Sequence, residues 1–178
     1  MTERSSPPHL RLVVVTPEPG KYAPKPASPR GTQLAFPYPE GSTVVFVFVD
    51  AIDRDEFTRI VSDYTPRWIF DVRVVPRLDT IAASRRSAFS LFERMKVSYV
   101  DLFGRLGIKS YRSAESNPAF WSSAVFELLK DAERKGPYLF LFDNEKLLRA
   151  ADEVLPDVIT PVIGKAARFA HIGQSSVC

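Results

Sequence analysis

The chain of 178 residues has one cysteine, Cys178, and two histidines, His9 and His171. A single cysteine excludes an intrachain disulfide framework and a zinc site built from several cysteines. The longest apolar run, residues 44–49, is far shorter than the roughly 20 residues that cross a membrane. The first residues are polar and proline-rich where a secretory signal would be apolar. We therefore expect a cytoplasmic protein without a membrane segment.

Several catalytic motifs are also absent from the sequence. The first predicted strand is followed by Ala51, Ile52 and Asp53 instead of a glycine-rich phosphate loop, which disfavours ordinary NAD or ATP binding. There is no Gly-x-Ser-x-Gly nucleophile elbow, and both histidines lie outside the predicted core. The Asp-x-Asp motif of acid phosphatases is also missing, because Asp50 is followed by Ala51 and Ile52 instead of a second aspartate two positions later. No nucleophile of a known catalytic class is therefore evident.

Proline is abundant at one end of the chain only. Residues 1–40 contain nine of the fifteen prolines, which disfavours helices and predicts an extended or disordered arm. The exception is the β-branched run at residues 10–15, which could add a strand to this chain's own sheet or to that of a partner. We expect an α/β domain from residue 41 to 163, followed by a loose tail from 164 to 178.

The domain begins with a strand, a helix and a second strand. Residues 43–49 are apolar on both faces, as in a central parallel strand covered by helices. Asp53 and Glu56 have the spacing of a helix-capping box before an amphipathic segment that Pro66 ends. Residues 68–75 then return to strand character. A unit of this length predicts right-handed parallel pairing.

The rest of the domain repeats this alternation. Helices are predicted at 85–96, from Pro118 after the cap Asn117, and at 145–155 before Pro156. Strands are predicted at 98–103 and 138–142, with an edge strand at 158–163, and polar loops at 77–84 and 109–117. The sequence therefore predicts a three-layer, Rossmann-like, mostly parallel sheet of four or five strands with helices on both faces.

Four predicted strands end at or near an aspartate. These residues are Asp50, Asp71, Asp101 and Asp143. Parallel strands would bring their carboxylates to one edge of the sheet, where ligands of this fold class bind. Asp50, Asp71 and Asp143 could hold Mg²⁺ through oxygen ligands. An aspartate after a strand is also a common turn and helix-capping residue, so the pattern has a purely structural alternative.

Basic residues are concentrated in the middle of the chain. Between residues 67 and 112 there are ten Lys and Arg against four Asp and Glu. Arg73, Arg77 and Arg105 could clamp a phosphate group at the edge with the aspartates, with Asp71 and Arg73 as the catalytic candidates. The alternative is a solvated basic surface. Nucleic acid is a further candidate partner, since three aromatic residues lie nearby for stacking (Tyr99, Tyr111 and Trp121), although no reading motif accompanies them.

Residues 57–107 resemble the domain of unknown function 488 family, small rhodanese-like α/β proteins. The resemblance lies in Phe57, in the strand Ile69-Phe70-Asp71-Val72-Arg73 with Pro76, in Ser87, Phe89 and Leu91, and in Val97-Ser98-Tyr99 before Leu106-Gly107. It implies the fold and an edge containing Asp71 and Arg73. Members of the family usually carry cysteine and a Cys-His-Arg run near the later strand and helix. This chain has Phe142-Asp143-Asn144-Glu145 there, so thiolate chemistry is not expected.

Two functional hypotheses follow from these patterns. In the first, which the sequence favours, the domain is a non-catalytic interaction or accessory subunit of a larger complex. Its proline-rich arm, the run at 10–15 and the tail around Phe169 would bind a protein partner. In the second, the chain binds or processes a phosphate-containing ligand or nucleotide with Mg²⁺. No other cofactor is predicted.

Overall fold

The computed structural model describes residues 43–130, 136–164 and 167–173. The proline-rich arm, including the predicted strand at 10–15, lies outside the described residues. Five strands form one sheet in the order β3-β2-β4-β1-β5, and every pair of neighbours is parallel. The strands are β1 (Thr43–Phe48), β2 (Trp68–Asp71), β3 (Ser98–Asp101), β4 (Tyr138–Phe142) and β5 (Arg168–Ile172). The predicted α/β fold with a parallel sheet is confirmed.

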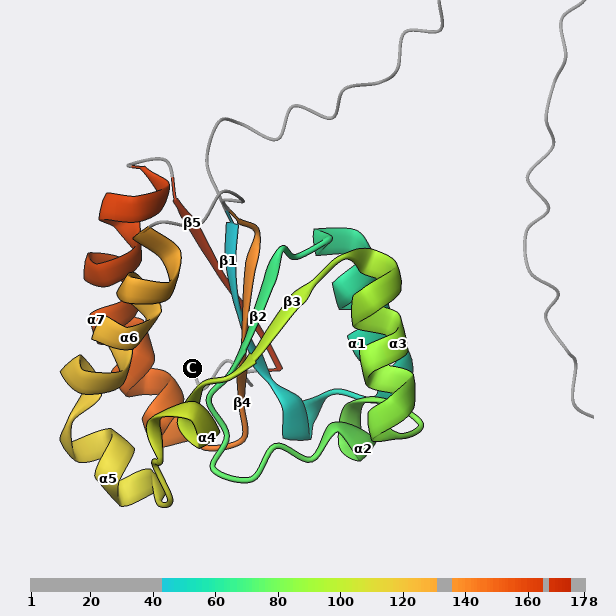
Figure 1. Cartoon of the computed structure of the whole chain (residues 1–178), viewed down its shortest axis with the longest axis horizontal. Coiled ribbons are helices and arrows are strands. Elements are labelled where there is room, and N and C mark those ends of the chain that lie inside the picture. Colours follow the sequence, from blue (N-terminus) through green and yellow to red (C-terminus); the bar gives the residue numbers. More distant parts are fainter. Residues whose placement is uncertain (1–42, 131–135, 165–166, 174–178) are drawn as a thin grey trace, which may run out of the picture. The chain divides into compact units, whose positions relative to one another are not determined.

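Helices cover both faces of this sheet (Figure 1). One face carries α1 (Arg54–Tyr64), α2 (Leu78–Ile81) and α3 (Arg85–Met95), and a short 3₁₀ turn, η1 (Val49–Ala51), follows β1. The other face carries α4 (Leu102–Leu106), α5 (Tyr111–Ser116), α6 (Pro118–Lys130) and α7 (Glu145–Ile163). The predicted three layers are therefore present.

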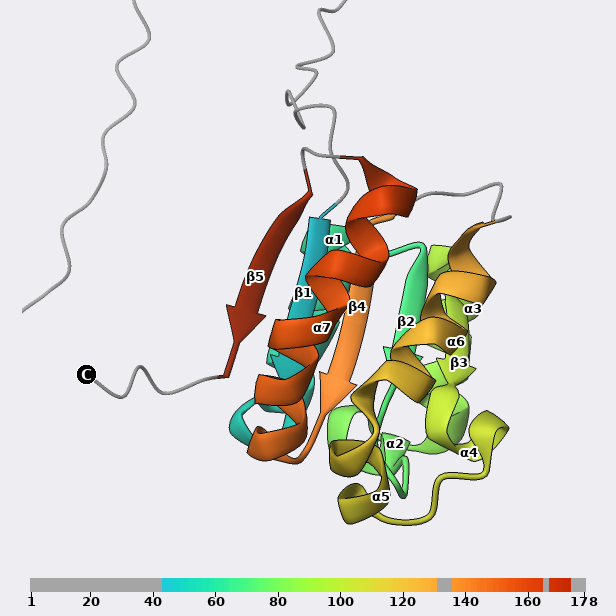
Figure 2. The same cartoon turned by 90° about the vertical axis from the view of Figure 1, so that its left-hand side faces the viewer.

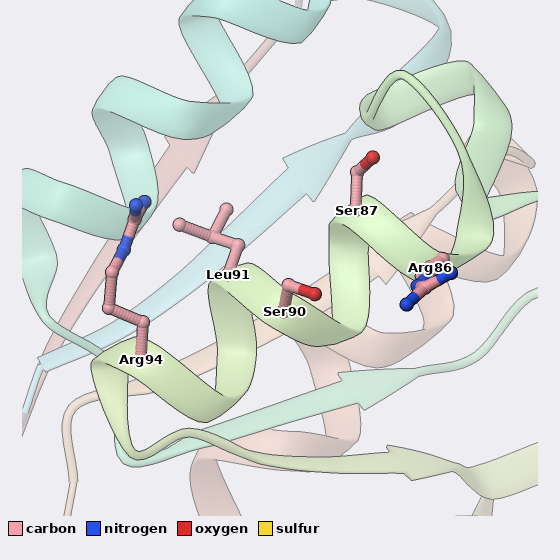
Figure 3. Close-up of a pocket in the computed structure, with 5 residues that line it drawn as sticks. All are labelled: Arg86, Ser87, Ser90, Leu91 and Arg94. Carbon is pink, nitrogen blue, oxygen red and sulfur yellow. The ribbon is translucent and has the colours of Figure 1, made fainter.

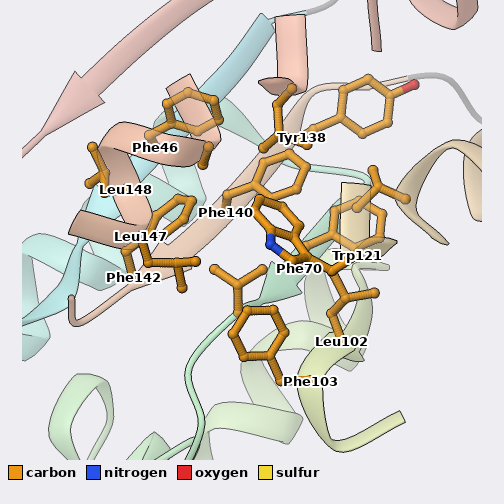
Figure 4. Close-up of a cluster of buried hydrophobic side chains, with 14 of the residues drawn as sticks. Phe46, Phe70, Leu102, Phe103, Trp121, Tyr138, Phe140, Phe142, Leu147 and Leu148 are labelled. Atoms are coloured by element: carbon orange, nitrogen blue, oxygen red, sulfur yellow. The ribbon is translucent and has the colours of Figure 1, made fainter. Parts of the chain in front are cut away.

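Alternating side chains of the strands supply two separate cores. Val45 and Val47 of β1 pack with α1 and α3, whereas Val44 and Phe46 pack with α6 and α7. Successive residues of a strand point to opposite faces, so a strand covered on both sides must be apolar throughout. Figure 4 shows the larger cluster, in which the rings of Phe70 and Phe140 stack with centroids 4.9 Å apart. The continuous apolar runs thus account for the central strands.

Polar caps begin several helices where the sequence predicts them. The side chain of Asp53 accepts a hydrogen bond from the Glu56 amide at 2.8 Å, at the start of α1. Asn117 accepts from the Phe120 amide at 3.3 Å, before α6. Each cap satisfies an amide that has no partner within the helix.

The end of the domain differs from the prediction. Pro156 does not end a helix, because α7 runs from Glu145 through Pro156 and Pro161 to Ile163. The predicted edge strand at 158–163 is therefore wrong. The edge strand is β5, in the segment predicted as a loose tail, and it pairs with β1 (Figure 2). Buried Leu155 and Ile159 continue the apolar stripe of α7 across Pro156, and this burial compensates for the cost of a proline in a helix.

The connections also contain more helix than predicted. The predicted loop at 77–84 holds α2, and the predicted loop at 109–117 holds α5. Strand β2 ends at Asp71 instead of residue 75, and β3 ends at Asp101 instead of residue 103. Among the helices that the structure describes, none has both the length and the apolar character needed to span a membrane.

Candidate functional site at the carboxyl edge of the sheet

Asp71 and Arg73, at and just beyond the end of β2, form a buried ion pair. Their side chains are 0% and 2% exposed. Arg73 donates from Nε to Oδ1 of Asp71 at 2.8 Å and from Nη2 to Oδ2 at 2.6 Å, and its backbone amide also donates to Oδ1 at 3.2 Å. Burial alone would lower the pKa of Arg73, but the hydrogen bond and charge of Asp71 raise it above its ordinary value. Arg73 is thus held charged and pointing inward.

Tyr99 of the neighbouring strand β3 completes the surroundings of Asp71. Its hydroxyl donates to Oδ2 of Asp71 at 2.9 Å, and its ring stacks on Phe92 with centroids 5.4 Å apart. Burial, followed by the charge of Asp71, raises the pKa of Tyr99, so the hydroxyl remains a donor. Both carboxylate oxygens of Asp71 are therefore engaged within the protein.

The segment after Asp71, residues 72–77, is fixed by a series of hydrogen bonds; we call it the 72–77 loop. Arg73 donates from Nη1 to the Arg77 carbonyl at 3.3 Å, and Thr80 donates its hydroxyl to the same oxygen at 2.7 Å. The amide of Val74 donates to the Tyr111 hydroxyl at 3.2 Å. Within this fixed loop the side chain of Val75 is 66% exposed.

Asp143, just after β4, accepts the hydrogen bond that the Tyr111 hydroxyl donates. Tyr111 therefore connects the end of β4 to the 72–77 loop. Burial raises the pKa of Asp143 above its ordinary value, and the nearby charge of Asp50 adds to this, while Tyr111 and Arg73 oppose it. Burial, followed by the bond to Asp143, raises the pKa of Tyr111 as well.

The remaining predicted site residues have separate roles. Asp50 is exposed in η1, and Asp101 caps α4 by accepting from the Gly104 amide at 2.8 Å. Arg77 forms an exposed ion pair with Asp79 at 2.9 Å. Arg105 lies on α4, where it lines a groove with α6. The structure therefore brings together Asp71 with Arg73, and places Asp143 near Arg73 and Asp50.

The three aspartates do not form the predicted magnesium site in this structure. Among residues 43–130, 136–164 and 167–173, no three acidic, histidine or cysteine side chains are grouped so that they could hold a metal ion. Asp71 is not available as a metal ligand here, because Arg73 and Tyr99 already bind both of its carboxylate oxygens. The three arginines of the predicted phosphate clamp have different surroundings: Arg73 binds Asp71, Arg77 pairs with Asp79, and Arg105 lines the groove between α4 and α6.

Two tyrosines that the sequence suggests only for base stacking are part of this network. Tyr99 and Tyr111 supply the hydroxyls that hold Asp71 and Asp143. Trp121 is fully buried, and its indole nitrogen donates to the Ala114 carbonyl at 3.3 Å. The short strand at residues 98–101 mixes polar and apolar residues, so its sequence indicates only weakly that the Tyr99 side chain points into the domain. No local pattern identifies Tyr111, because its partners lie 37 and 32 residues away.

Two surface hollows lie away from this network. One, of about 340 Å³, follows α3 and is lined by Arg86, Ser87, Ser90, Leu91 and Arg94. Figure 3 shows that Arg86 and Arg94 lie at opposite ends and do not point toward one another, so they do not form a clamp for one anion. The other, of about 300 Å³, lies between α4 and α6.

Comparison of the chain with protein-family models, curated proteins and solved structures gives no significant match. The resemblance to the domain of unknown function 488 family therefore stays a prediction.

Proposed function

We propose that this domain is a non-catalytic interaction domain, an accessory subunit that presents the 72–77 loop to a protein partner. The observation that carries the proposal is the exposed Val75 within a loop whose backbone is held by buried Arg73 and half-buried Tyr111. A loop already held in its binding conformation loses little conformational entropy on association. An exposed apolar side chain on such a loop is suited to fill a pocket on a partner.

The arrangement of the polar groups supports the same proposal. Arg73 and Tyr99 satisfy Asp71, Asp101 caps α4, and Tyr111 bonds both Asp143 and the Val74 amide. All these contacts are directed within the protein, and those of Arg73 and Tyr111 stabilise the loop. Their role in the proposal is to position Val75, and not to contact a substrate.

The proline-rich arm at residues 1–40 is a second contact region in this proposal, which rests on its composition alone. An extended, proline-rich segment can bind along a partner's surface at a small entropy cost. Phe169 has a different role, because it lies in β5 and its ring packs against Phe46 with centroids 6.1 Å apart. The arm and the loop are therefore the regions to test.

Site-specific photo-crosslinking tests the loop in cells that produce the protein. A photoreactive amino acid at position 75 should crosslink to one discrete partner, while the same group at exposed Arg59 on α1 serves as the matched control. The crosslinked protein is then identified and purified. If position 75 gives no crosslink beyond the control, the proposed loop interface is wrong.

Binding of the purified components provides the quantitative test. Val75→Asp should raise the dissociation constant about tenfold or more, since a charge replaces a buried apolar contact. Arg59→Asp should leave it unchanged, and deletion of residues 1–40 should weaken binding independently. Circular dichroism confirms that each variant is folded. Equal affinity of the Val75→Asp and wild-type proteins contradicts the proposal.

A further inference from the structure

Strand β3 is one edge of the sheet and pairs on one side only, with β2. Among the described residues, no other strand pairs with its outer side. All four residues, Ser98–Asp101, are exposed or partly exposed. The strand contains no proline or lysine, which commonly protect edges from pairing, and its one charged side chain, Asp101, is turned back onto the Gly104 amide. Within the part of the chain that the structure describes, this edge is therefore free to pair with a further strand.

Apolar side chains flank β3 on both faces of the sheet. On the α3 face, Phe89 is 39% exposed and lies edge-on to Tyr99 with ring centroids 5.5 Å apart. On the opposite face, the groove of about 300 Å³ between α4 and α6 is lined by Leu102, Leu106, Ala124 and Leu128, together with Arg105 and Glu127. Phe120, 52% exposed, lies one helical turn before Ala124 on α6.

The other edge strand has a different surface. In β5 the exposed side chains are Arg168 and His171, and His171 binds Asp152 at 3.0 Å. The large hydrophobic residues that are most exposed in the described chain are Val75, Phe89 and Phe120, none of which lies on β5 or α7. Of the two edge strands, β3 is therefore the one with large exposed apolar side chains beside it.

The chemistry of the β3 edge is self-complementary. A two-fold axis perpendicular to the sheet, at Val100, would pair β3 with itself in antiparallel fashion. Val100 would then oppose its own counterpart, and Tyr99 would oppose Asp101, so no like charges face one another. The same axis places the two α4–α6 grooves on one side of the joined sheet. Each groove carries Arg105 and Glu127, and Glu127 also forms an exposed ion pair with Lys130 of its own helix. Opposite charges of the two copies can meet across the axis.

We infer that a second copy of this chain binds at the β3 edge, giving a symmetric dimer with one continuous ten-stranded sheet. Backbone hydrogen bonds between the two β3 strands would provide the pairing, as in strand addition generally. Phe89 and the α4–α6 groove would be covered by their counterparts. The Val75 loop lies after β2 and not on β3, so this inference is independent of the proposed interaction with another protein.

The test is the oligomeric state of the full chain, measured by sedimentation over a range of concentrations. The expected mass is twice 20.0 kDa. Arg105→Glu and Glu127→Lys should each raise the dimer dissociation constant about tenfold or more, because each places like charges at the interface. The double variant should restore dimerisation, since the opposite charges are exchanged. Arg59→Glu on α1 is the control and should dimerise normally.

Backbone hydrogen exchange gives a second measurement. The outward amides of residues 98–101 should exchange more slowly as the concentration rises, and this protection should be lost in the Arg105→Glu variant. A protein that stays monomeric throughout overturns the inference. A dimer that neither single variant weakens, and whose β3 amides stay unprotected, overturns it equally.

Discussion

Arg73 holds Asp71 through two parallel hydrogen bonds while both side chains are buried at the end of β2. A buried ion pair of this geometry is costly to break, because removal of one partner leaves the other charged and without compensation. The pair is therefore a structural brace for the loop that follows β2.

This brace gives the first prediction. Arg73→Met should lower the free energy of unfolding by roughly 3–5 kcal/mol, the usual cost of stranding one member of a buried pair. Asp71→Leu should cost a similar amount, and the double variant should cost clearly less than the sum of the two. Urea unfolding of the four proteins measures the coupling. A loss below about 1 kcal/mol in both single variants would contradict a buried structural pair.

The second prediction concerns the carboxyl group of Asp143. Its folded-state pKa is raised above the ordinary value of 3.8, mainly by burial, so the native state binds this proton more tightly than the unfolded state. The contribution to stability is complete below the unfolded value and is lost as pH rises through the raised folded value. Asp143→Asn cannot ionise, and its carbonyl oxygen can still accept from Tyr111.

Relative to the wild type, Asp143→Asn should therefore gain stability as pH rises from about 3 to 8. Urea unfolding across that range, with wild type and variant compared at each pH, measures the difference. Tyr111→Phe serves as the companion variant, because it removes the hydrogen bond while leaving the carboxyl group ionisable. A variant that becomes relatively less stable with rising pH would show that hydrogen bonding of the ionised form outweighs its burial.

The third prediction distinguishes a cap from a ligand at Asp101. Its carboxylate accepts from the Gly104 amide at 2.8 Å, at the start of α4. Asp101→Ala should cost about 0.5–2 kcal/mol of stability, whereas Asp101→Asn, which retains a capping oxygen, should cost little. Thermal and urea unfolding provide the measurement. If Asn were as damaging as Ala, the negative charge and not the cap would be the important feature.

The fourth prediction concerns the prolines within α7. Pro161 is exposed, lacks the amide that would bond to the preceding turn, and lies inside a continuous helix. Pro161→Ala should raise the free energy of unfolding by roughly 1–3 kcal/mol, with Glu153→Ala on the same helix as a control that changes it by less than about 0.5 kcal/mol. A loss of stability on replacing Pro161 would mean that its ring makes contacts that outweigh the missing hydrogen bond.

Local sequence patterns predict much of this domain. The runs at 43–49 and 138–142 identify central strands, because a strand covered on both faces is apolar at nearly every position. Asp53 and Asn117 mark helix starts for an equally local reason, since their oxygens bind amides three residues ahead. Each of these caps joins residues that are three positions apart, so the local sequence is enough to predict it.

Long-range packing decides the remainder. Pro156 is a helix breaker by its own chemistry, yet Leu155 and Ile159 keep α7 helical because their burial in the core outweighs that cost. The partners of Asp71 and Asp143 are likewise set by the fold, since Tyr99 lies 28 residues from one and Tyr111 lies 32 residues from the other. The aspartates at the strand ends were visible in the sequence. Whether each would face a ligand, an arginine or a helix amide depended on the three-dimensional arrangement of distant segments.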